Sequence, residues 1–304
     1  MMGMSKKVVD ALKYLRKKKA FYLMCLPYLI GFAIFELYPV VDAFVFSFQS
    51  WGGGRGGGAF LQPTFVGLNN YMEMFSDELF VLSLKNSIII TITFVLLTTA
   101  ISLVLALLLD QKIKGVDLFS TCYFIPYATA PVIMAVIMRI IFNKAGAANW
   151  LLNKLGLPAI NWLGPELALF TVVIAMAWNF FGYCVVILLA GLQTIPTVFY
   201  EAASIDGAGK ITQIREITLP LIKPILIVTL FLETVYGIKA YDIIYGMTGG
   251  GPGFQTLTLP YYIYVQGFEN WALGYADAMG VVLFFIVLVI AFIERKAIGT
   301  ITEY

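Results

Sequence analysis

The sequence predicts an all-α, polytopic membrane protein with six transmembrane helices. Of its 304 residues, 60% are hydrophobic and only 12% are charged, whereas charged residues make up about 25% of ordinary soluble domains. A helix needs about 20 mainly apolar residues to cross the hydrocarbon core of a bilayer, and six segments approach or reach that length. We expect these spans at residues 20–48, 84–110, 118–142, 167–192, 221–246 and 275–294.

The six predicted spans differ in the charged residues that they contain. The second, third and fourth have long cores without a charged side chain. The first is interrupted by Glu36 and Asp42, and the fifth by Glu233, Lys239 and Asp242, so the ends of these two are less sharply marked. The basic N-terminus and first apolar run are similar to a signal peptide, but the run is too long and lacks a small-x-small cleavage site. We therefore expect a retained first helix.

The orientation follows from the distribution of basic residues, because positively charged loops stay in the cytoplasm. With the N-terminus inside, the segments predicted to be internal contain the basic N-terminus and Lys112, Lys114, Lys210, Arg215, Lys223, Arg295 and Lys296. The segments predicted to be external contain only Arg55, Lys85, Lys144 and Lys154. Both termini are therefore predicted to be cytoplasmic.

The spans divide the chain into a simple order of segments. We expect a basic cytoplasmic N-terminus at 1–19, the first helix at 20–48, an external loop at 49–83, a five-helix core at 84–295 with a cytoplasmic loop at 196–224, and a cytoplasmic tail at 296–304. The external loop contains a glycine-rich tract at residues 52–58, which is typical of a flexible linker. A contact surface for an external partner is the alternative for this tract.

The composition excludes several classes of function. A net charge of +2, with the basic residues at segment ends, does not fit nucleic-acid binding. The chain has no histidine, the commonest proton shuttle and metal ligand. Its three cysteines, Cys25, Cys122 and Cys184, lie far apart in apolar segments and predict neither disulfides nor a zinc site. We expect no metal or cofactor bound by this chain.

The loop at 196–224 contains the most informative pattern in the sequence. Pro196 is suited to the start of a short helix, and the small pair Ala202 and Ala203 allows another protein to approach closely. Gly207 is suited to end that helix, because glycine adopts a left-handed conformation without strain. A second short amphipathic segment follows, and Pro220 then precedes the fifth span. The pattern predicts two short helices joined by a glycine.

This loop resembles the EAA loop of ABC importer permeases. The matching pattern is Glu201-Ala202-Ala203, three residues, Gly207, nine residues, and Ile217-x-Leu219-Pro220. The downstream residues Thr248-Gly249-Gly250-Gly251-Pro252 and Tyr275-Ala276-Asp277-Ala278 are similar to the sugar-transport branch, which includes the maltose and glycerol-phosphate permeases. The resemblance covers about residues 20 to 295, almost the whole chain.

The resemblance implies a MetI-like, type I importer core made of the last five helices and paired with a second, homologous permease. It also implies two ATPase subunits that bind ATP and magnesium, an extracytoplasmic solute-binding protein, and alternating access in a bacterial or archaeal inner membrane. The residues expected to couple this chain to the ATPase are Glu201, Ala202, Ala203, Asp206 and Gly207. Glu201 would pair with a basic group of the ATPase, and the alternative is a solvated acid on an exposed helix.

The same loop contains a stretch that resembles a phosphate-binding loop. Residues 204–211 end in Gly209, Lys210 and Ile211, but that motif requires a first glycine where Ser204 stands and a serine or threonine where Ile211 stands. The chain is therefore not expected to bind ATP or to catalyse a reaction. The resemblance assigns ATP hydrolysis to the partner subunits.

Charged residues in the fifth span indicate a solute pathway, because a charge inside a membrane costs about 2.5–3.5 kcal/mol and usually faces a cavity or a partner. A span starting near residue 221 would place Glu233 about 18 Å deep, near the bilayer midplane. Tyr236 and Tyr241 would stack on sugar rings and donate hydrogen bonds. The structural alternative is that Glu233 pairs with Lys239 or Arg139 and locks helices together.

The resemblance to the maltose permease implies positions for the solute contacts. Counting back from Gly250-Gly251-Pro252 and outward from Trp178, the matching positions are Asn179, Phe180, Tyr183, Glu233, Tyr236, Gly237 and Ala240. Most of the residue types differ from those of that relative, so the position of the pocket transfers better than its specificity. The expected solute is a carbohydrate, and the particular one stays open.

Two other classes of membrane protein fit the sequence less well. An ion-coupled secondary transporter or channel would use Glu233 and Lys239 to bind ions, but such proteins often contain internal repeats and paired broken helices, and the halves of this chain show no convincing repeat. A membrane-embedded enzyme would require converging acid and base groups at one membrane face, which a chain without histidine does not suggest. Neither class requires an EAA-like loop.

Overall fold

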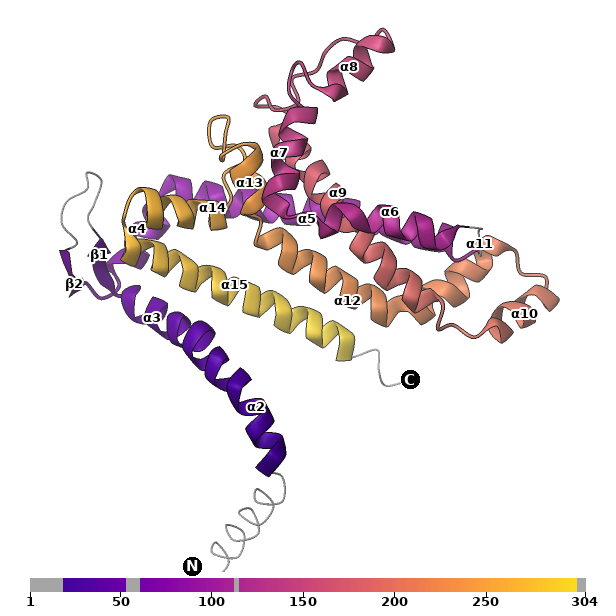
Figure 1. Ribbon diagram of the computed structural model, residues 1–304, viewed down its shortest axis with the longest axis horizontal. Coiled ribbons are helices and arrows are strands. Elements are labelled where there is room, and N and C mark those ends of the chain that lie inside the picture. The colour runs from indigo at the N-terminus through magenta and orange to yellow at the C-terminus, as the bar shows by residue number, and fades with distance from the viewer. Residues whose placement is uncertain (1–18, 53–60, 112–114, 300–304) are drawn as a thin grey trace, which may run out of the picture.

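The computed structural model describes residues 19–52, 61–111 and 115–299. Long helices lie side by side in one bundle (Figure 1). The long elements are α2 (Lys19–Phe32), η1 (Ala33–Leu37), α3 (Tyr38–Phe46), α5 (Glu78–Leu109), α6 (Val116–Ala128), α7 (Pro131–Ile141), α9 (Ala168–Leu192), α12 (Leu219–Ile238) and α15 (Leu273–Gly299).

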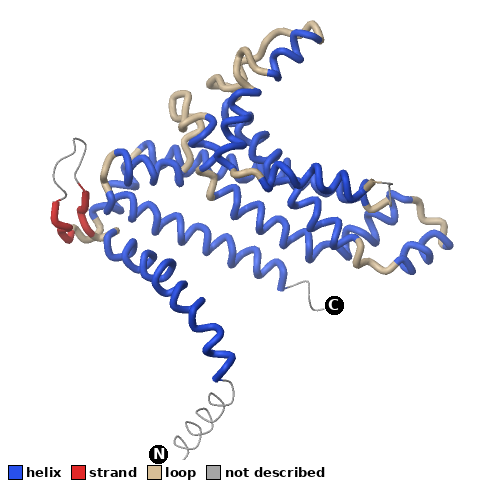
Figure 2. The backbone as a smooth tube through the Cα atoms, viewed as in Figure 1, coloured by secondary structure: helices blue, strands red, loops and turns tan. Residues whose placement is uncertain are grey.

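Short elements connect the long helices. They are β1 (Gln49–Gly52), β2 (Leu61–Phe65), α4 (Asn69–Ser76), α8 (Ala147–Lys154), α10 (Thr197–Ile205), α11 (Lys210–Gln213), η2 (Ile214–Thr218), α13 (Asp242–Met247), α14 (Leu259–Tyr264) and η3 (Val265–Glu269). The strands β1 and β2 form an antiparallel hairpin in which Gln49 faces Phe65, and Figure 2 shows this hairpin toward one end of the bundle. In Figure 1, α10 lies at the other end, and α7 and α8 project from the side of the bundle.

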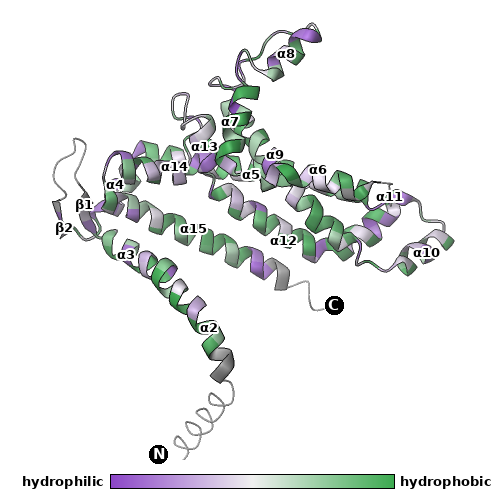
Figure 3. Cartoon of the chain, viewed as in Figure 1, coloured by the Kyte–Doolittle hydropathy of each residue, from purple (hydrophilic) through white to green (hydrophobic). Residues whose placement is uncertain are grey.

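The apolar helices confirm the predicted six-span, all-α fold. Within the described residues, five helices are long and apolar enough to cross a membrane, and there are six if the bent pair α6–α7 is counted as one span. Figure 3 shows that hydrophobic residues cover most of the long helices. The central helix is α9, which packs against α5, α6 and α12 and is buried along most of its length.

The first span is one continuous helix from α2 through the π-helical turn η1 to α3. In Figure 1, α2 points away from the bundle, whereas α3 lies beside α15. There the ring of Phe44 meets Phe284 and Phe285 edge to face, with centroids 5.8 and 5.9 Å apart. The exposed apolar side chains of α2 are therefore available to lipid or to another membrane subunit.

The third predicted span, at residues 118–142, is bent in the middle. Helix α6 ends at Ala128 and α7 begins at Pro131, and the two helices meet at an angle of 98°. Pro131 has no backbone N–H to continue the ladder of α6, and a residue before proline is held away from the helical conformation. Ala130 accordingly has an extended ψ of 131°.

The fifth predicted span is also shorter than expected. Helix α12 ends at Ile238, and a break precedes α13 at Asp242. The sequence predicts Lys239 and Asp242 in the outer half of one continuous helix. In the structure they lie on either side of a break. The carbonyl of Ala240 accepts a hydrogen bond from the Thr258 hydroxyl at 2.7 Å, which satisfies backbone that a continuous helix would have paired internally.

The second span begins at Glu78 instead of residue 84, so the predicted loop at 49–83 contains the hairpin, α4 and the first turn of α5. Asp77 caps α5, because its carboxylate accepts a hydrogen bond from the backbone N–H of Leu79 at 2.8 Å. Parts of three predicted segments lie outside the described residues: 1–18 of the basic N-terminus predicted at 1–19, 53–58 of the glycine tract predicted at 52–58, and 300–304 of the tail. Lys112 and Lys114 also lie outside them.

Helices α6 and α9 touch at a glycine. A Cβ atom on Gly182 would lie 1.7 Å from the backbone oxygen of Tyr123 and 2.4 Å from its carbonyl carbon. Backbone cannot give way as a flexible side chain can, so only glycine permits this approach. Small residues serve the same purpose wherever membrane helices pack closely.

We predict that Gly182→Ala destabilises the purified protein by roughly 1–3 kcal/mol, because the added methyl group overpacks the α6–α9 contact. The matched control is Gly280→Ala in α15, where an added Cβ meets nothing within 4 Å. The thermal midpoint in detergent should fall for Gly182→Ala and stay level or rise slightly for Gly280→Ala. Equal midpoints for the two variants would contradict this contact.

Hydrogen bonds to Asp77 join α14 and α15 to the start of α5. The Asp77 carboxylate accepts hydrogen bonds from the Tyr262 hydroxyl at 2.5 Å and the Tyr275 hydroxyl at 2.8 Å. Burial disfavours ionisation of this carboxyl, but the bonds from Tyr262, Tyr275 and the backbone N–H of Leu79 outweigh burial and hold the pKa of Asp77 below its usual value. The ionised form is therefore the one that stabilises this junction.

We predict that Asp77→Asn lowers the free energy of unfolding by about 1–2 kcal/mol at pH 7, because an amide accepts fewer hydrogen bonds than a carboxylate. The folded pKa is lowered, so this stabilisation is complete above the unfolded pKa of about 3.9 and is lost as the pH falls through the folded pKa. Thermal unfolding at pH 7 and below pH 4 should show the difference from wild type shrinking in acid. The exposed Glu166→Gln serves as the control, and a pH-independent difference would refute the role of the charge.

Candidate functional site

The loop that resembles the EAA loop forms an exposed helix at one end of the bundle. Helix α10 follows Pro196, and Figure 1 places it beyond the ends of α9 and α12. Glu201, Ala202 and Asp206 are exposed, whereas Ala203 is half-buried. Together with Gly207 they lie on or directly after one short helix, so all five predicted coupling residues are close together.

Gly207 allows the turn that separates the two short helices. Its φ is +81°, in the left-handed region that side chains adopt only with strain, and nothing lies within 4 Å of an added Cβ. The predicted pair of short helices is confirmed as α10 and α11. Ser204 lies in α10 and Ile211 in α11, so a helix precedes this stretch where a phosphate-binding loop follows a strand.

Hydrogen bonds brace α10 against α11 and η2. The Gln213 amide donates to the Ser204 hydroxyl at 3.0 Å and to the carbonyl of Ala208 at 3.2 Å. The hydroxyls of Tyr200 and Thr218 lie 3.0 Å apart. Since η2 runs from Ile214 directly into α12, a displacement of α10 would act on α12.

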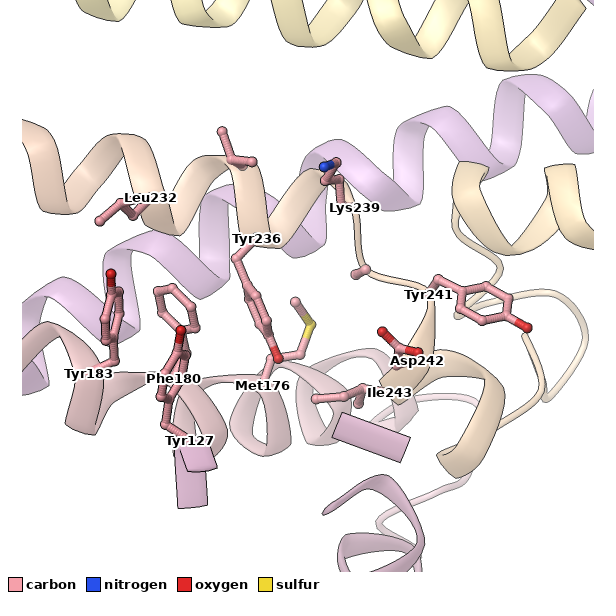
Figure 4. Close-up of a pocket in the computed structure, with 12 residues that line it drawn as sticks. Tyr127, Met176, Phe180, Tyr183, Leu232, Tyr236, Lys239, Tyr241, Asp242 and Ile243 are labelled. Carbon is pink, nitrogen blue, oxygen red and sulfur yellow. The ribbon is translucent and has the colours of Figure 1, made fainter. Parts of the chain in front are cut away.

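A cavity of about 320 Å³ lies between α9 and α12, at the level of the two helix breaks (Figure 4). Its lining comes from the end of α6, from α9, and from α12 through the break into α13. The lining residues are Tyr127, Met176, Phe180, Tyr183, Leu232, Val235, Tyr236, Lys239, Ala240, Tyr241, Asp242 and Ile243. This cavity is called the aromatic pocket below.

Aromatic rings pack in pairs along the wall of the aromatic pocket. Phe180 and Tyr236 stack with centroids 4.3 Å apart, and Tyr127 and Tyr183 stack at 4.5 Å. Lys239 and Asp242 supply one positive and one negative charge among these rings. Rings with a few polar groups are typical of a site for a small amphipathic ligand.

The side-chain amide of Asn179 links the helices that surround the aromatic pocket. Its Nδ2 donates to the carbonyl of Pro126 at 2.7 Å, and its Oδ1 accepts from the Tyr236 hydroxyl at 2.8 Å. This pair of bonds joins α6, α9 and α12 just below the bend after α6. Tyr236 therefore presents its ring to the pocket, and its hydroxyl is engaged by Asn179.

Four of the seven predicted solute-contact residues line the aromatic pocket: Phe180, Tyr183, Tyr236 and Ala240. The other three, Asn179, Glu233 and Gly237, are buried outside the lining. An added Cβ on Gly237 would lie 3.0 Å from the Thr91 side chain, so Gly237 faces α5.

Glu233 also faces α5 and not the pocket. Its side chain is fully buried, and its carboxyl group accepts a hydrogen bond from the Thr99 hydroxyl. Among the described residues it forms no ion pair with Lys239 or Arg139, so the predicted ion pairs are absent. Glu233 instead joins α12 to α5.

Tyr127 and Met176 are pocket residues that the sequence reasoning missed, since both stand in spans read as ordinary membrane helices. A signal for Tyr127 was present in Pro126 and Pro131, because two prolines within a predicted span favour a break. Tyr241, which is predicted to stack on sugar rings, lines the pocket, and so do Lys239 and Asp242, two of the charged residues that indicate a solute pathway in the fifth span. No sequence signal indicates Met176.

Comparisons with known proteins agree with this arrangement. Residues 114–296 match the family model described as "Binding-protein-dependent transport system inner membrane component". The trehalose/maltose transport system permease protein of Thermococcus litoralis is 37% identical over 292 residues, which cover 95% of this chain and 96% of that protein. The arabinooligosaccharides transport system permease protein of Bacillus subtilis is 34% identical over 93% of this chain and 90% of that protein.

A solved structure supports the fold independently. A chain from a bacterial ABC transporter involved in the import of the acidic polysaccharide alginate superposes with a TM-score of 0.84 and 23% identity, over 97% of this chain and 100% of that chain. The fold expected from the EAA-like loop is thereby confirmed. With its bundle, its exposed loop helix and a family match over more than half its length, this chain belongs to the inner membrane components of binding-protein-dependent transport systems.

Proposed function

We propose that this chain is the translocation subunit of an ATP-driven importer for a carbohydrate and works by alternating access. The observation that carries the proposal is the course of α12, which lines the aromatic pocket near one end and continues through η2 and α11 into the loop of α10 at the other. A force applied to α10 would reach the pocket along one helix.

The chemistry of the pocket supports a carbohydrate. Sugar rings have apolar faces that pack on aromatic rings, and hydroxyl groups that pair with charged side chains. The stacked pairs Phe180–Tyr236 and Tyr127–Tyr183 supply the rings, and Lys239 and Asp242 supply polar contacts. The names of the relatives, which refer to trehalose, maltose and arabinooligosaccharides, favour the same class.

The exposed helix α10 suggests how the energy enters. We infer that α10 inserts into an ATPase subunit, where Glu201 pairs with a basic group, Ala202 and Ala203 permit close contact, and Gly207 keeps the turn. Two such subunits would bind ATP and magnesium, a second permease would face this chain, and an external solute-binding protein would deliver the solute. The distribution of Lys and Arg supports a cytoplasmic location for α10 and for both termini.

Binding of the ATPase should depend on the coupling residues. We predict that Glu201→Lys and Gly207→Asp each reduce the ATPase that copurifies with the C-terminally tagged chain by roughly tenfold, because a wrong charge at an interface costs more than about 1.4 kcal/mol. The chain is extracted gently from its native membrane, and mass spectrometry quantifies each partner.

Matched controls for this experiment are Glu166→Lys, an exposed charge reversal, and Gly156→Asp, at a glycine with a φ of +74° and open space around it. Both should leave the copurified ATPase within about twofold of wild type. A chain that purifies without an ATPase, or variants and controls that lose it equally, would contradict the proposal.

Substitution of a pocket residue should change the KM for transport, whereas substitution of a buried residue that faces α5 should not. We predict that Tyr183→Ala raises the KM for uptake by about tenfold, because a ring that stacks on solute is lost. Glu233→Gln should change KM by less than about twofold, because the amide still accepts from Thr99 and does not touch solute. Initial uptake rates at several solute concentrations give both values. An equal rise in KM for both variants would place Glu233 on the pathway.

A further inference from the structure

A row of aromatic rings continues outward from the aromatic pocket. The row comprises Tyr241, Tyr245, Tyr264 and Phe268, from the break after α12, from α13, from α14 and from η3, and is called the ring row here. Tyr241 and Tyr245 are nearly parallel, with centroids 5.7 Å apart. Tyr264 lies 5.3 Å from Tyr241, and Phe268 lies 5.5 Å from Tyr264. Each ring therefore touches the next.

The ring row is open to ligand. Tyr245 is 47% exposed and Phe268 is 64% exposed, while Tyr241 and Tyr264 are half-buried. Behind the row, the buried Tyr261 stacks on Tyr264 with centroids 6.1 Å apart. The row consists of two near-parallel pairs, Tyr241–Tyr245 and Tyr264–Phe268, and the planes of Tyr245 and Tyr264 lie at 75° to each other. The exposed rings of both pairs offer apolar surface in two orientations.

The elements that carry the ring row are fixed to the bundle. The backbone N–H of Leu259, at the start of α14, donates to the Ser87 hydroxyl at 2.8 Å. The Tyr262 hydroxyl donates to Asp77, and Thr258 donates to the carbonyl of Ala240. Rings held in place lose little conformational freedom when a ligand binds, so each contact contributes more fully.

The ring row and the aromatic pocket share Tyr241. In Figure 4 the ring of Tyr241 points away from Phe180 and Tyr236. The volume of the pocket, about 320 Å³, is at the lower limit of the roughly 300–1,000 Å³ that small-molecule sites occupy. An oligosaccharide would therefore fill the pocket with one end and extend along Tyr241.

We propose that the ring row is a second carbohydrate-binding surface, which holds the sugar units of an oligosaccharide that extend beyond the aromatic pocket. The proposal rests on the proposed function of the chain as a carbohydrate importer. The apolar faces of successive sugar rings pack on Tyr245, Tyr264 and Phe268, and the contact does not depend on one hydroxyl pattern. The alternative is an aromatic belt that sits at the membrane surface and touches only lipid.

The test compares short and long oligosaccharides of one linkage, using the pairs maltose and maltohexaose, and arabinobiose and arabinohexaose. The complete importer, with its binding protein and ATPase, is reconstituted in proteoliposomes, and KM is measured for wild type and for Tyr245→Ala, Phe268→Ala and Phe268→Tyr. The matched control is Phe65→Ala in β2, an exposed ring, 78% exposed, outside the row.

The proposal expects the two alanine variants to raise KM for the hexasaccharide by roughly three- to tenfold, because a ring contact is lost. The disaccharide should change by less than about twofold, and Phe268→Tyr and Phe65→Ala should resemble wild type for both lengths. Equal changes for both lengths, or none, would overturn the ring row but leave the importer intact. If the wild-type importer takes up disaccharides but not hexasaccharides, that result also overturns the ring row and leaves the proposed importer function intact. Uptake of neither pair by wild type would overturn the proposed function as well.

Discussion

The pairing of backbone groups at two broken helices is the constraint on which the rest of this structure depends. Hydrocarbon offers no hydrogen bonds, so irregular backbone inside a membrane must be satisfied by protein. At the first break the carbonyl of Pro126 accepts from the Asn179 amide, and at the second the carbonyl of Ala240 accepts from the Thr258 hydroxyl. These bonds satisfy one backbone carbonyl at each break, next to the cavity between α9 and α12.

The same breaks determine what the cavity can do. Because α12 ends at Ile238, Lys239 reaches the cavity from the break and Asp242 from the first residue of α13, while α12 runs without a break from Ile238 back to η2. A continuous helix between the cavity and the loop that carries α10 is what transmission of a mechanical step requires. The buried bond between Glu233 and Thr99 ties that helix to α5, so α5 and α12 would move as a unit.

The sequence predicts the number of spans and the exposed loop helix well, because both leave local signals. Long apolar runs define the spans, and the spacing from Glu201 to Pro220 defines the loop. It does not predict which face of a span meets the cavity, because α12 and α9 are apolar all round and have little periodicity. Glu233 and Gly237 were therefore assigned to the solute pathway although they face α5. Tyr127 packs on Phe180 and Tyr183 beside the 98° bend between α6 and α7, a tertiary arrangement that the local sequence does not encode.

The energy source of uptake tests the central claim most directly. The complete importer is reconstituted in proteoliposomes with its binding protein outside, and uptake of labelled maltose and arabinobiose is measured with and without enclosed ATP, and with and without a protonophore. An ATP-driven permease accumulates sugar only when ATP is enclosed and is insensitive to the protonophore. Uptake that proceeds without ATP and stops when the proton gradient collapses would contradict the account and identify an ion-coupled transporter.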